Sequence, residues 1–137
     1  MEFLDAEEIG GRIDGIIHDE TQFSSFGIDL TVNRIGRFTG PGALDFGGSE
    51  FAEADVEWIP PKKNDPSDDY GWWGLDSAQY VVEFNETLTE TSDGVALVTP
   101  LERLLRAGAS HPTFQPAADE PLSTVLQVGR CGVRIKE

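Results

Sequence analysis

The sequence predicts an all-β domain, and two features of its pattern support this class. Short runs of β-branched and aromatic residues alternate with polar residues, a period of two that is typical of half-buried strands. Clusters of glycine, proline, asparagine and aspartate separate these runs and indicate turns. About seven to nine short strands with one short helix fit a β-sandwich or a β-barrel. The 137 residues suit a single domain, residues 1–137, whose core needs no disulfide.

The first part of the chain is predicted to be irregular, with a short helix somewhere within residues 1–20. Apolar side chains recur between residues 3 and 17, but Gly10 and Gly11 interrupt any long helix. Residues 25–35 then alternate strictly, which predicts a half-buried strand. Its apolar face is expected to consist of Phe26, Ile28, Leu30 and Val32. Asp29 falls on the polar face.

The middle of the chain is predicted to hold turns, a strand and an exposed loop. Residues 36–48 are rich in glycine and indicate turns around a short strand. Residues 51–59 are predicted as another strand, which ends before Pro60 and Pro61. Residues 60–71 are polar, so we expect them to form an exposed, mobile hairpin tip and not a linker between domains.

The second half of the chain is predicted to contain strands at residues 79–88, 94–98, 122–128 and 132–136. The clearest is the first of these, in which Tyr80, Val82 and Phe84 share one face. A short helix is predicted over residues 101–107, after Pro100 and before Gly108.

The charge balance restricts the partners of this protein. The chain has 25 acidic and 10 basic residues, for a formal net charge of −15. Such a surface repels phosphate backbones and anionic lipids, so neither nucleic acid nor a membrane is expected as a partner. The acidic residues are spread along the whole chain, which suits a high-salt cytoplasm where ions screen self-repulsion. We therefore predict a halophilic source, with disorder or an acidic interaction tail as the alternatives.

The cysteine and histidine content excludes two kinds of site. Cys131 is the single cysteine, so neither a disulfide framework nor a thiolate zinc site is expected, and we predict a small buried apolar side chain. His18 and His111 are the two histidines and lie far apart in the sequence, which disfavours a zinc site. The sequence has neither a signal-peptide pattern nor an apolar stretch of about 18 residues. A soluble, cytoplasmic protein is expected.

Two further groups of residues have structural interpretations. The acidic residues of the polar loop, Asp65, Asp68 and Asp69, lack the glycine and closing glutamate of a calcium loop, so a solvated loop is expected. Trp72 and Trp73 are expected to cover the core or a subunit interface.

A segment near the C-terminus carries a recognisable motif. Residues 98–111 read Val-Thr-Pro-Leu-Glu-Arg-Leu-Leu-Arg-Ala-Gly-Ala-Ser-His. This segment resembles the Pro-Arg-Ser-Ser-Leu-x-Arg-x-Gly helix of the dUTPase and dCTP deaminase superfamily. The matching positions are Pro100, Leu104, Leu105, Arg106 and Gly108.

Other segments resemble the same superfamily, in the same order along the chain. Residues 26–30, Phe-Gly-Ile-Asp-Leu, are similar to its first motif, and residues 75–86 are similar to the strand before its helix. Residues 111–114, His-Pro-Thr-Phe, stand where its substrate hairpin begins. With residues 126–137, which resemble its last pair of strands, the resemblance covers roughly residues 22–137.

The resemblance implies a fold, an assembly and a class of substrate. The fold is a dUTPase-like distorted β-barrel, or jelly-roll, and the assembly is a homotrimer. The substrate is a deoxynucleoside triphosphate, either dUTP or dCTP. The metal is Mg²⁺, which the triphosphate carries to the site.

The first motif and the helix supply three of the site residues that the resemblance implies. Asp29 takes the position of the aspartate that organises the metal-bound phosphates; the alternative is an aspartate at a strand end that bonds local backbone amides. Arg103 and Arg106 are candidate ligand-binding residues, and Arg106 is the one that matches the motif. The alternative for Arg106 is an ion pair, with Glu102 one turn earlier or with a carboxylate of another subunit.

The hairpin supplies the remaining candidates and departs most from the superfamily. His111 and Gln115 are candidate ligand-binding residues. Pro116 falls where the water-activating aspartate is expected, and Asp119 is the candidate catalytic residue if the hairpin has shifted its register. The deaminase glutamate is also replaced, because residues 124–127 read Thr-Val-Leu-Gln.

Two hypotheses about function follow from these residues. The first is an enzyme of deoxynucleotide metabolism, most simply a dUTP diphosphatase that converts dUTP to dUMP and pyrophosphate with Mg²⁺. The alternative is a catalytically degenerate member of the superfamily that binds nucleotides or has a regulatory or structural role.

The net charge predicts that the folded state needs salt. The Debye length shrinks from ~30 Å at 0.01 M to ~3 Å at 1 M, so added ions should relieve repulsion among the 25 acidic residues. We expect the melting temperature to rise markedly between these two concentrations of NaCl. Chloride is preferred to sulfate because sulfate stabilises folded proteins by exclusion from their surface. A flat or falling melting curve would exclude salt adaptation.

Overall fold

The computed structural model describes residues 2–25, 27–89 and 94–137, and its main element is a six-stranded antiparallel sheet. Along this sheet the strands run β3-β2-β5-β7-β6, and β1 pairs with β5 outside that path. Their bounds are β1 (Ile13–Asp14), β2 (Val32–Phe38), β3 (Val56–Ile59), β5 (Gln79–Leu88), β6 (Ala109–Ser110) and β7 (Pro121–Val128). A second sheet pairs β4 (Trp72–Leu75) with β8 (Val133–Lys136). The predicted all-β class is confirmed.

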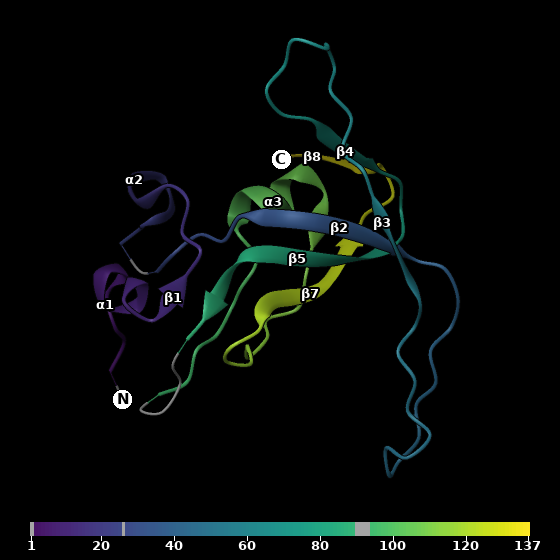
Figure 1. Cartoon of the computed structure of the whole chain (residues 1–137), viewed down its shortest axis with the longest axis horizontal. Coiled ribbons are helices and arrows are strands. Elements are labelled where there is room, and N and C mark those ends of the chain that lie inside the picture. Colours follow the sequence, from purple (N-terminus) through teal and green to yellow (C-terminus); the bar gives the residue numbers. More distant parts are fainter. Residues whose placement is uncertain (1, 26, 90–93) are drawn as a thin grey trace.

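The helices are short and lie at the margins of the sheets (Figure 1). They are α1 (Ala6–Gly10), α2 (Asp19–Gln22) and α3 (Glu102–Ala107). The helix predicted over residues 101–107 is confirmed as α3, and the N-terminal segment, for which the sequence predicts a short helix, forms α1 and α2. Asp5 begins α1 by accepting a hydrogen bond from Glu8 N. No helix in the described parts of the chain has the length and apolar character needed to cross a membrane.

The core lies between the two sheets. On the large sheet, the paired residues Tyr80 and Leu126 are both buried, as are Ile35 and Val82 on the neighbouring pair of strands. The small sheet contributes Trp73 and other buried side chains to the same apolar cluster. The Trp73 indole N–H donates to Ile59 O at 2.7 Å, so the polar atom of this buried ring has a partner. The expectation that Trp73 covers the core is confirmed.

The strand β5 confirms the clearest prediction from the sequence. It spans Gln79–Leu88, and every second residue is buried from Tyr80 onward. It pairs with β1, β2 and β7, so its backbone is bonded on both edges. The predicted strands near the C-terminus are also confirmed as β7 and β8.

Two predicted strands are wrong over much of their length. The regular part of residues 25–35 begins at Val32, because the backbone of residues 29–31 bonds mainly to Gln22 of α2 and to the Glu86 side chain, and joins the backbone of β5 through Thr31 O. Phe26 lies outside the described residues. Residues 94–98 contribute a single bridge, between Val98 and Phe114, and Val95 and Leu97 remain exposed.

Cys131 is exposed, so the prediction of a buried apolar residue is wrong. It lies in the turn between β7 and β8. The next residue, Gly132, has φ +77, a backbone conformation that L side chains rarely adopt.

Two hairpin loops extend from the body (Figure 1). Residues 39–55, which we call the arm, join β2 to β3 and are held by the bridge between Ala43 and Ala52. Residues 60–71 join β3 to β4 and are held by the bridge between Lys62 and Trp72. Most of the second loop is exposed.

The helix α3 follows the local pattern of the sequence closely. It begins after the N-cap residue Leu101 and ends at Gly108, which has φ +109. The N–H of Gly108 bonds to the carbonyls of Leu104 and Leu105, which satisfies the last turn of the helix. The helix contacts β6 and thereby fixes its position beside the large sheet.

Candidate functional site

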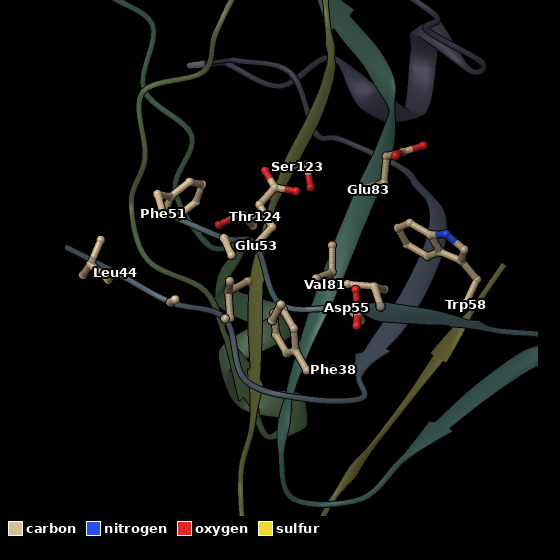
Figure 2. A pocket seen from close by; sticks show the side chains of 16 residues that line it. Phe38, Leu44, Phe51, Glu53, Asp55, Trp58, Val81, Glu83, Ser123 and Thr124 are labelled. Carbon is tan, nitrogen blue, oxygen red and sulfur yellow. The ribbon is translucent and has the colours of Figure 1, made fainter. Parts of the chain in front are cut away.

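Two hollows on the described part of the surface differ in the charges of their linings. The hollow shown in Figure 2 has a volume of about 850 Å³ and lies between the arm and the outer face of the large sheet. Phe38, Leu44 and Phe51 line it together with the carboxylates of Glu53 and Asp55. No lysine, arginine or histidine occurs among the described residues that line it. It is therefore unsuited to a triphosphate.

The second hollow, which we call the cleft, has a volume of about 910 Å³ and opens onto the core side of the large sheet. Three of the predicted site residues line it: Asp29, Arg103 and His111. Arg134 and Lys136 of β8 also line it. The lining of the cleft therefore includes cations as well as the carboxylates of Asp29 and Glu137, whereas the described lining of the outer hollow includes no cation.

Asp29 and Arg103 face one another across the mouth of the cleft. The Asp29 Oδ2 atom lies 3.7 Å from a terminal nitrogen of Arg103, and their side chains are 25% and 75% exposed. Such an exposed pair adds little to stability because water competes with it. Both groups are consequently free to exchange partners when a charged ligand enters.

The Arg106 side chain pairs within α3 and does not pair with Asp29. Its Nε atom lies 3.9 Å from Glu102 Oε1, and both side chains are more than 80% exposed. This is the pairing within one helix that the sequence offered as the alternative. Arg106 does not occur among the described residues that line the cleft, so Arg103 is the arginine that the fold directs there.

His111 forms part of the cleft wall and is 8% exposed. Its Nδ1 atom lies 2.8 Å from Pro112 O, and because a carbonyl only accepts, Nδ1 carries the proton. The ring packs edge-on against Phe84 and Phe114, with centroid distances of 6.4 and 6.0 Å. His111 is thus held rigidly by its surroundings.

Gln115 and Asp119 are exposed and do not occur among the described residues that line the cleft, whereas Pro116 does. Asp119 has φ 65, a left-handed conformation that aspartate tolerates better than most residues. Its N–H donates to Leu88 O at 2.8 Å. The structure therefore places the backbone of Asp119 in a turn beside the end of β5.

The sequence interpretation missed a buried network beneath Asp29. Glu86 is fully buried and accepts hydrogen bonds from Gln22, which is 2% exposed, and from Thr31. The sequence contained one indication of this network, because Glu86 lies between Phe84 and Leu88 in the series of core-facing residues of β5. A carboxylate in such a series needs donors that the fold must supply.

The acidic loop shows the expected character of a solvated turn. Asp65 accepts from both the backbone N–H and the hydroxyl of Ser67, and these bonds hold the pKa of Asp65 below its ordinary value. Asp68 accepts from the backbone N–H of Asp65. No group of three or more metal-ligating side chains occurs in the described parts of the chain.

Asp29 suits an Mg²⁺ ion that is bound jointly by the protein and by a phosphate substrate. Mg²⁺ usually keeps several waters and is held by one or two carboxylates together with the phosphates of its substrate. Asp29 is a single carboxylate that lines a cleft next to an arginine. This suits a metal that arrives with a triphosphate and not one held by a protein cage.

Comparison with known proteins gives relatives of one kind. The chain is 31% identical over 101 residues to a probable deoxyuridine 5'-triphosphate nucleotidohydrolase of Methanosarcina mazei, a match that covers 74% of this chain and 56% of the relative. A protein of the same description from Methanococcoides burtonii is 30% identical, with the same coverage. One from Methanosarcina acetivorans is 31% identical. No protein-family model matches the chain.

The mostly-β fold and the charged cleft define the class as a small β-sheet protein. With the relatives, they place the chain in the dUTPase-like superfamily, and the resemblance seen in the sequence is confirmed. The chain spans about half the length of the curated relatives it matches, 56% in each case.

Proposed function

We propose that this protein binds dUTP in the cleft and hydrolyses it to dUMP and pyrophosphate. The observation that carries the proposal is the pairing of Asp29 with Arg103 at the cleft that also contains His111. The relatives support the choice of dUTP over dCTP, since they are described as probable deoxyuridine 5'-triphosphate nucleotidohydrolases. The deaminase reaction has less support, because Gln127 and its neighbours provide no carboxylate where that chemistry requires one.

Binding in this proposal depends on exchange of partners at the mouth of the cleft. Arg103 releases Asp29 and donates to phosphate oxygens, an interaction stronger than its exposed contact with a carboxylate. Asp29 would hold the Mg²⁺ that the triphosphate carries, and the metal would supply positive charge that offsets the charge on the phosphates. Arg134 and Lys136 line the same cleft and add positive potential.

Hydrolysis needs a group that accepts a proton from the attacking water. Pro116 lines the cleft but has no basic atom, and Asp119 lies outside it in the single chain. We propose that Asp119 acts on a cleft shared between subunits, where its exposed side chain faces the nucleotide bound by a neighbour. Water attacks a phosphorus atom of dUTP in line with the leaving group, and pyrophosphate departs as dUMP forms.

The position of Asp119 also supports a second function, that of a degenerate member of the superfamily that binds dUTP without turnover. The observation in its favour is that Pro116 occupies the cleft where a base is needed. Turnover measurements separate the two functions, because binding is common to both.

We propose a homotrimer as the assembly. The arm presents large apolar side chains to solvent, including Leu44 at 88% exposure, Phe46 at 110% and Phe51 at 56%. Apolar patches of this kind commonly mark protein interfaces. Leu44 and Phe51 line the outer hollow, which is unsuited to a triphosphate and so available for contact with a second copy of the chain.

Substitution of the two arginines should show which one binds the nucleotide. We expect Arg103→Gln to weaken binding of dUTP with Mg²⁺ about tenfold or more, because a charge-assisted hydrogen bond is worth roughly 1.5–3 kcal/mol. Arg106→Gln removes the same charge from the same helix and should change the affinity much less. Isothermal titration at molar salt measures both. A larger loss at Arg106 would show that the residue matching the superfamily motif binds the phosphates in the assembly.

The turnover of dUTP should be weak and should depend on Asp119. A well-placed general base contributes about 10²–10⁴-fold, so a displaced one should leave a slow enzyme. We expect Asp119→Asn to abolish the residual release of pyrophosphate, while Asp65→Asn, which removes an equally exposed carboxylate from the acidic loop, leaves it unchanged. Brisk turnover that survives Asp119→Asn would contradict this role. Firm binding without any turnover would establish the degenerate function.

Light scattering should detect the trimer. In molar salt we expect about three times the mass of the 15.0 kDa chain. Phe46→Ser should shift the protein toward monomer, whereas Phe3→Ser, at a site 89% exposed but distant from the arm in sequence, should not. A monomer at micromolar concentration for the wild-type chain would overturn the proposed assembly.

A further inference from the structure

We propose that Glu86 is a positioning residue for the cleft: it holds Gln22 and Thr31, and through them fixes the backbone that presents Asp29. The proposal rests on the proposed function, in which Asp29 serves the bound nucleotide. It concerns a residue that has no exposed surface and therefore touches no ligand itself.

Every group that reaches Glu86 is a donor. Gln22 Nε2 donates to Oε1 at 2.9 Å. The Thr31 backbone N–H lies 2.9 and 3.0 Å from the two carboxylate oxygens, and the Thr31 hydroxyl donates to Oε1 at 2.5 Å. Asn85 donates in turn to the Thr31 hydroxyl at 3.0 Å, which directs the hydroxyl proton toward Glu86. The carboxylate is thus the common acceptor of the network.

The Gln22 side chain has only one orientation that satisfies its neighbours. Its Oε1 accepts from the backbone N–H groups of Ile17 and His18, both at 2.9 Å. Its Nε2 donates to Asp29 O as well as to Glu86. A flipped amide would set its NH₂ group against two N–H donors and its oxygen against two acceptors. Glu86 therefore holds an amide that is bonded on all sides.

These contacts immobilise the backbone of Asp29. Its N–H donates to Gln22 O at 2.7 Å, and its carbonyl accepts from Gln22 Nε2 at 2.9 Å. Two residues further on, Thr31 is bonded directly to Glu86 and its carbonyl accepts from Asn85 N. The Asp29 side chain is left at the cleft, facing Arg103.

Stability alone does not explain why a carboxylate is buried at this position. Transfer of such a group from water is costly, and an apolar side chain of similar volume is often at least as stabilising at a buried site. Leu88, the next core-facing residue of β5, shows that this face accepts an apolar side chain. An apolar residue, however, would supply no acceptor for the three donors on Gln22 and Thr31.

The test compares Glu86→Gln with Glu83→Gln. Both substitutions remove one carboxylate from β5, but Glu83 lies on the opposite face, where it pairs with Arg34 at 3.0 Å. In Glu86→Gln the amide oxygen can take the place of Oε1, but the NH₂ group then stands where Oε2 accepts from the Thr31 N–H. We expect the amides of Asp29 and Thr31 to lose hydrogen-exchange protection about tenfold or more, with little change at β7. Glu83→Gln should leave both amides protected.

Binding of dUTP with Mg²⁺, measured by calorimetry, connects this effect to the site. We expect Glu86→Gln to weaken binding, and the double variant with Asp29→Asn to bind no more weakly than Asp29→Asn alone, because Glu86 acts through Asp29. Additive losses would overturn the proposal. So would a Glu86→Gln protein that melts at a lower temperature while its affinity and the protection of Asp29 and Thr31 stay unchanged.

A second variant tests the same proposal if the Glu86→Gln protein does not fold. Gln22→Leu keeps the side-chain volume roughly the same and removes the link between Glu86 and Asp29. It should produce the same exchange pattern at Asp29 and the same loss of binding, and wild-type behaviour would overturn the proposal. Absence of dUTP binding by the wild-type protein would refute the proposed function instead. The exchange measurements would then still decide whether Glu86 positions Asp29.

Discussion

The structure depends on the strand β5 and the hydrogen-bonded ladders on its two edges. β2 and β7 pair with it on opposite sides, and β1 extends the pairing near its end. One face of β5 supplies buried apolar residues to the core between the sheets, and the same face carries Glu86. The strand that organises the core therefore also organises the segment that holds Asp29.

Charge is distributed unevenly over this protein, whose net charge is −15. The cleft gathers Arg103, Arg134 and Lys136, while the outer hollow shown in Figure 2 has carboxylates and no cation among its described lining residues. Local potential, and not net charge, decides where an anion binds at high ionic strength, because screening limits the range of distant charges.

This protein resembles dUTPase-like proteins more in the arrangement of its elements than in its candidate catalytic residues. The helix α3 keeps its glycine cap at Gly108, as the motif requires, yet the arginine that reaches the cleft is Arg103 and not Arg106. The hairpin brings Pro116 to the cleft and leaves Asp119 in a turn outside it. A fold of this kind can retain a nucleotide site while its proton-transfer group changes place.

The sequence by itself determined the all-β class, the strand β5 and the end of α3 at Gly108, because alternation and a left-handed cap are properties of neighbouring residues. Through its resemblance to known proteins it also indicated Asp29, Arg103 and His111 as candidate site residues. Only the tertiary structure decided that these three line one cleft, that Arg106 does not, and that residues 29–31 leave the strand pattern to bond Gln22 and Glu86. The contacts of Glu86 with Gln22 and Thr31 join residues more than fifty positions apart, and local periodicity carries no information about them.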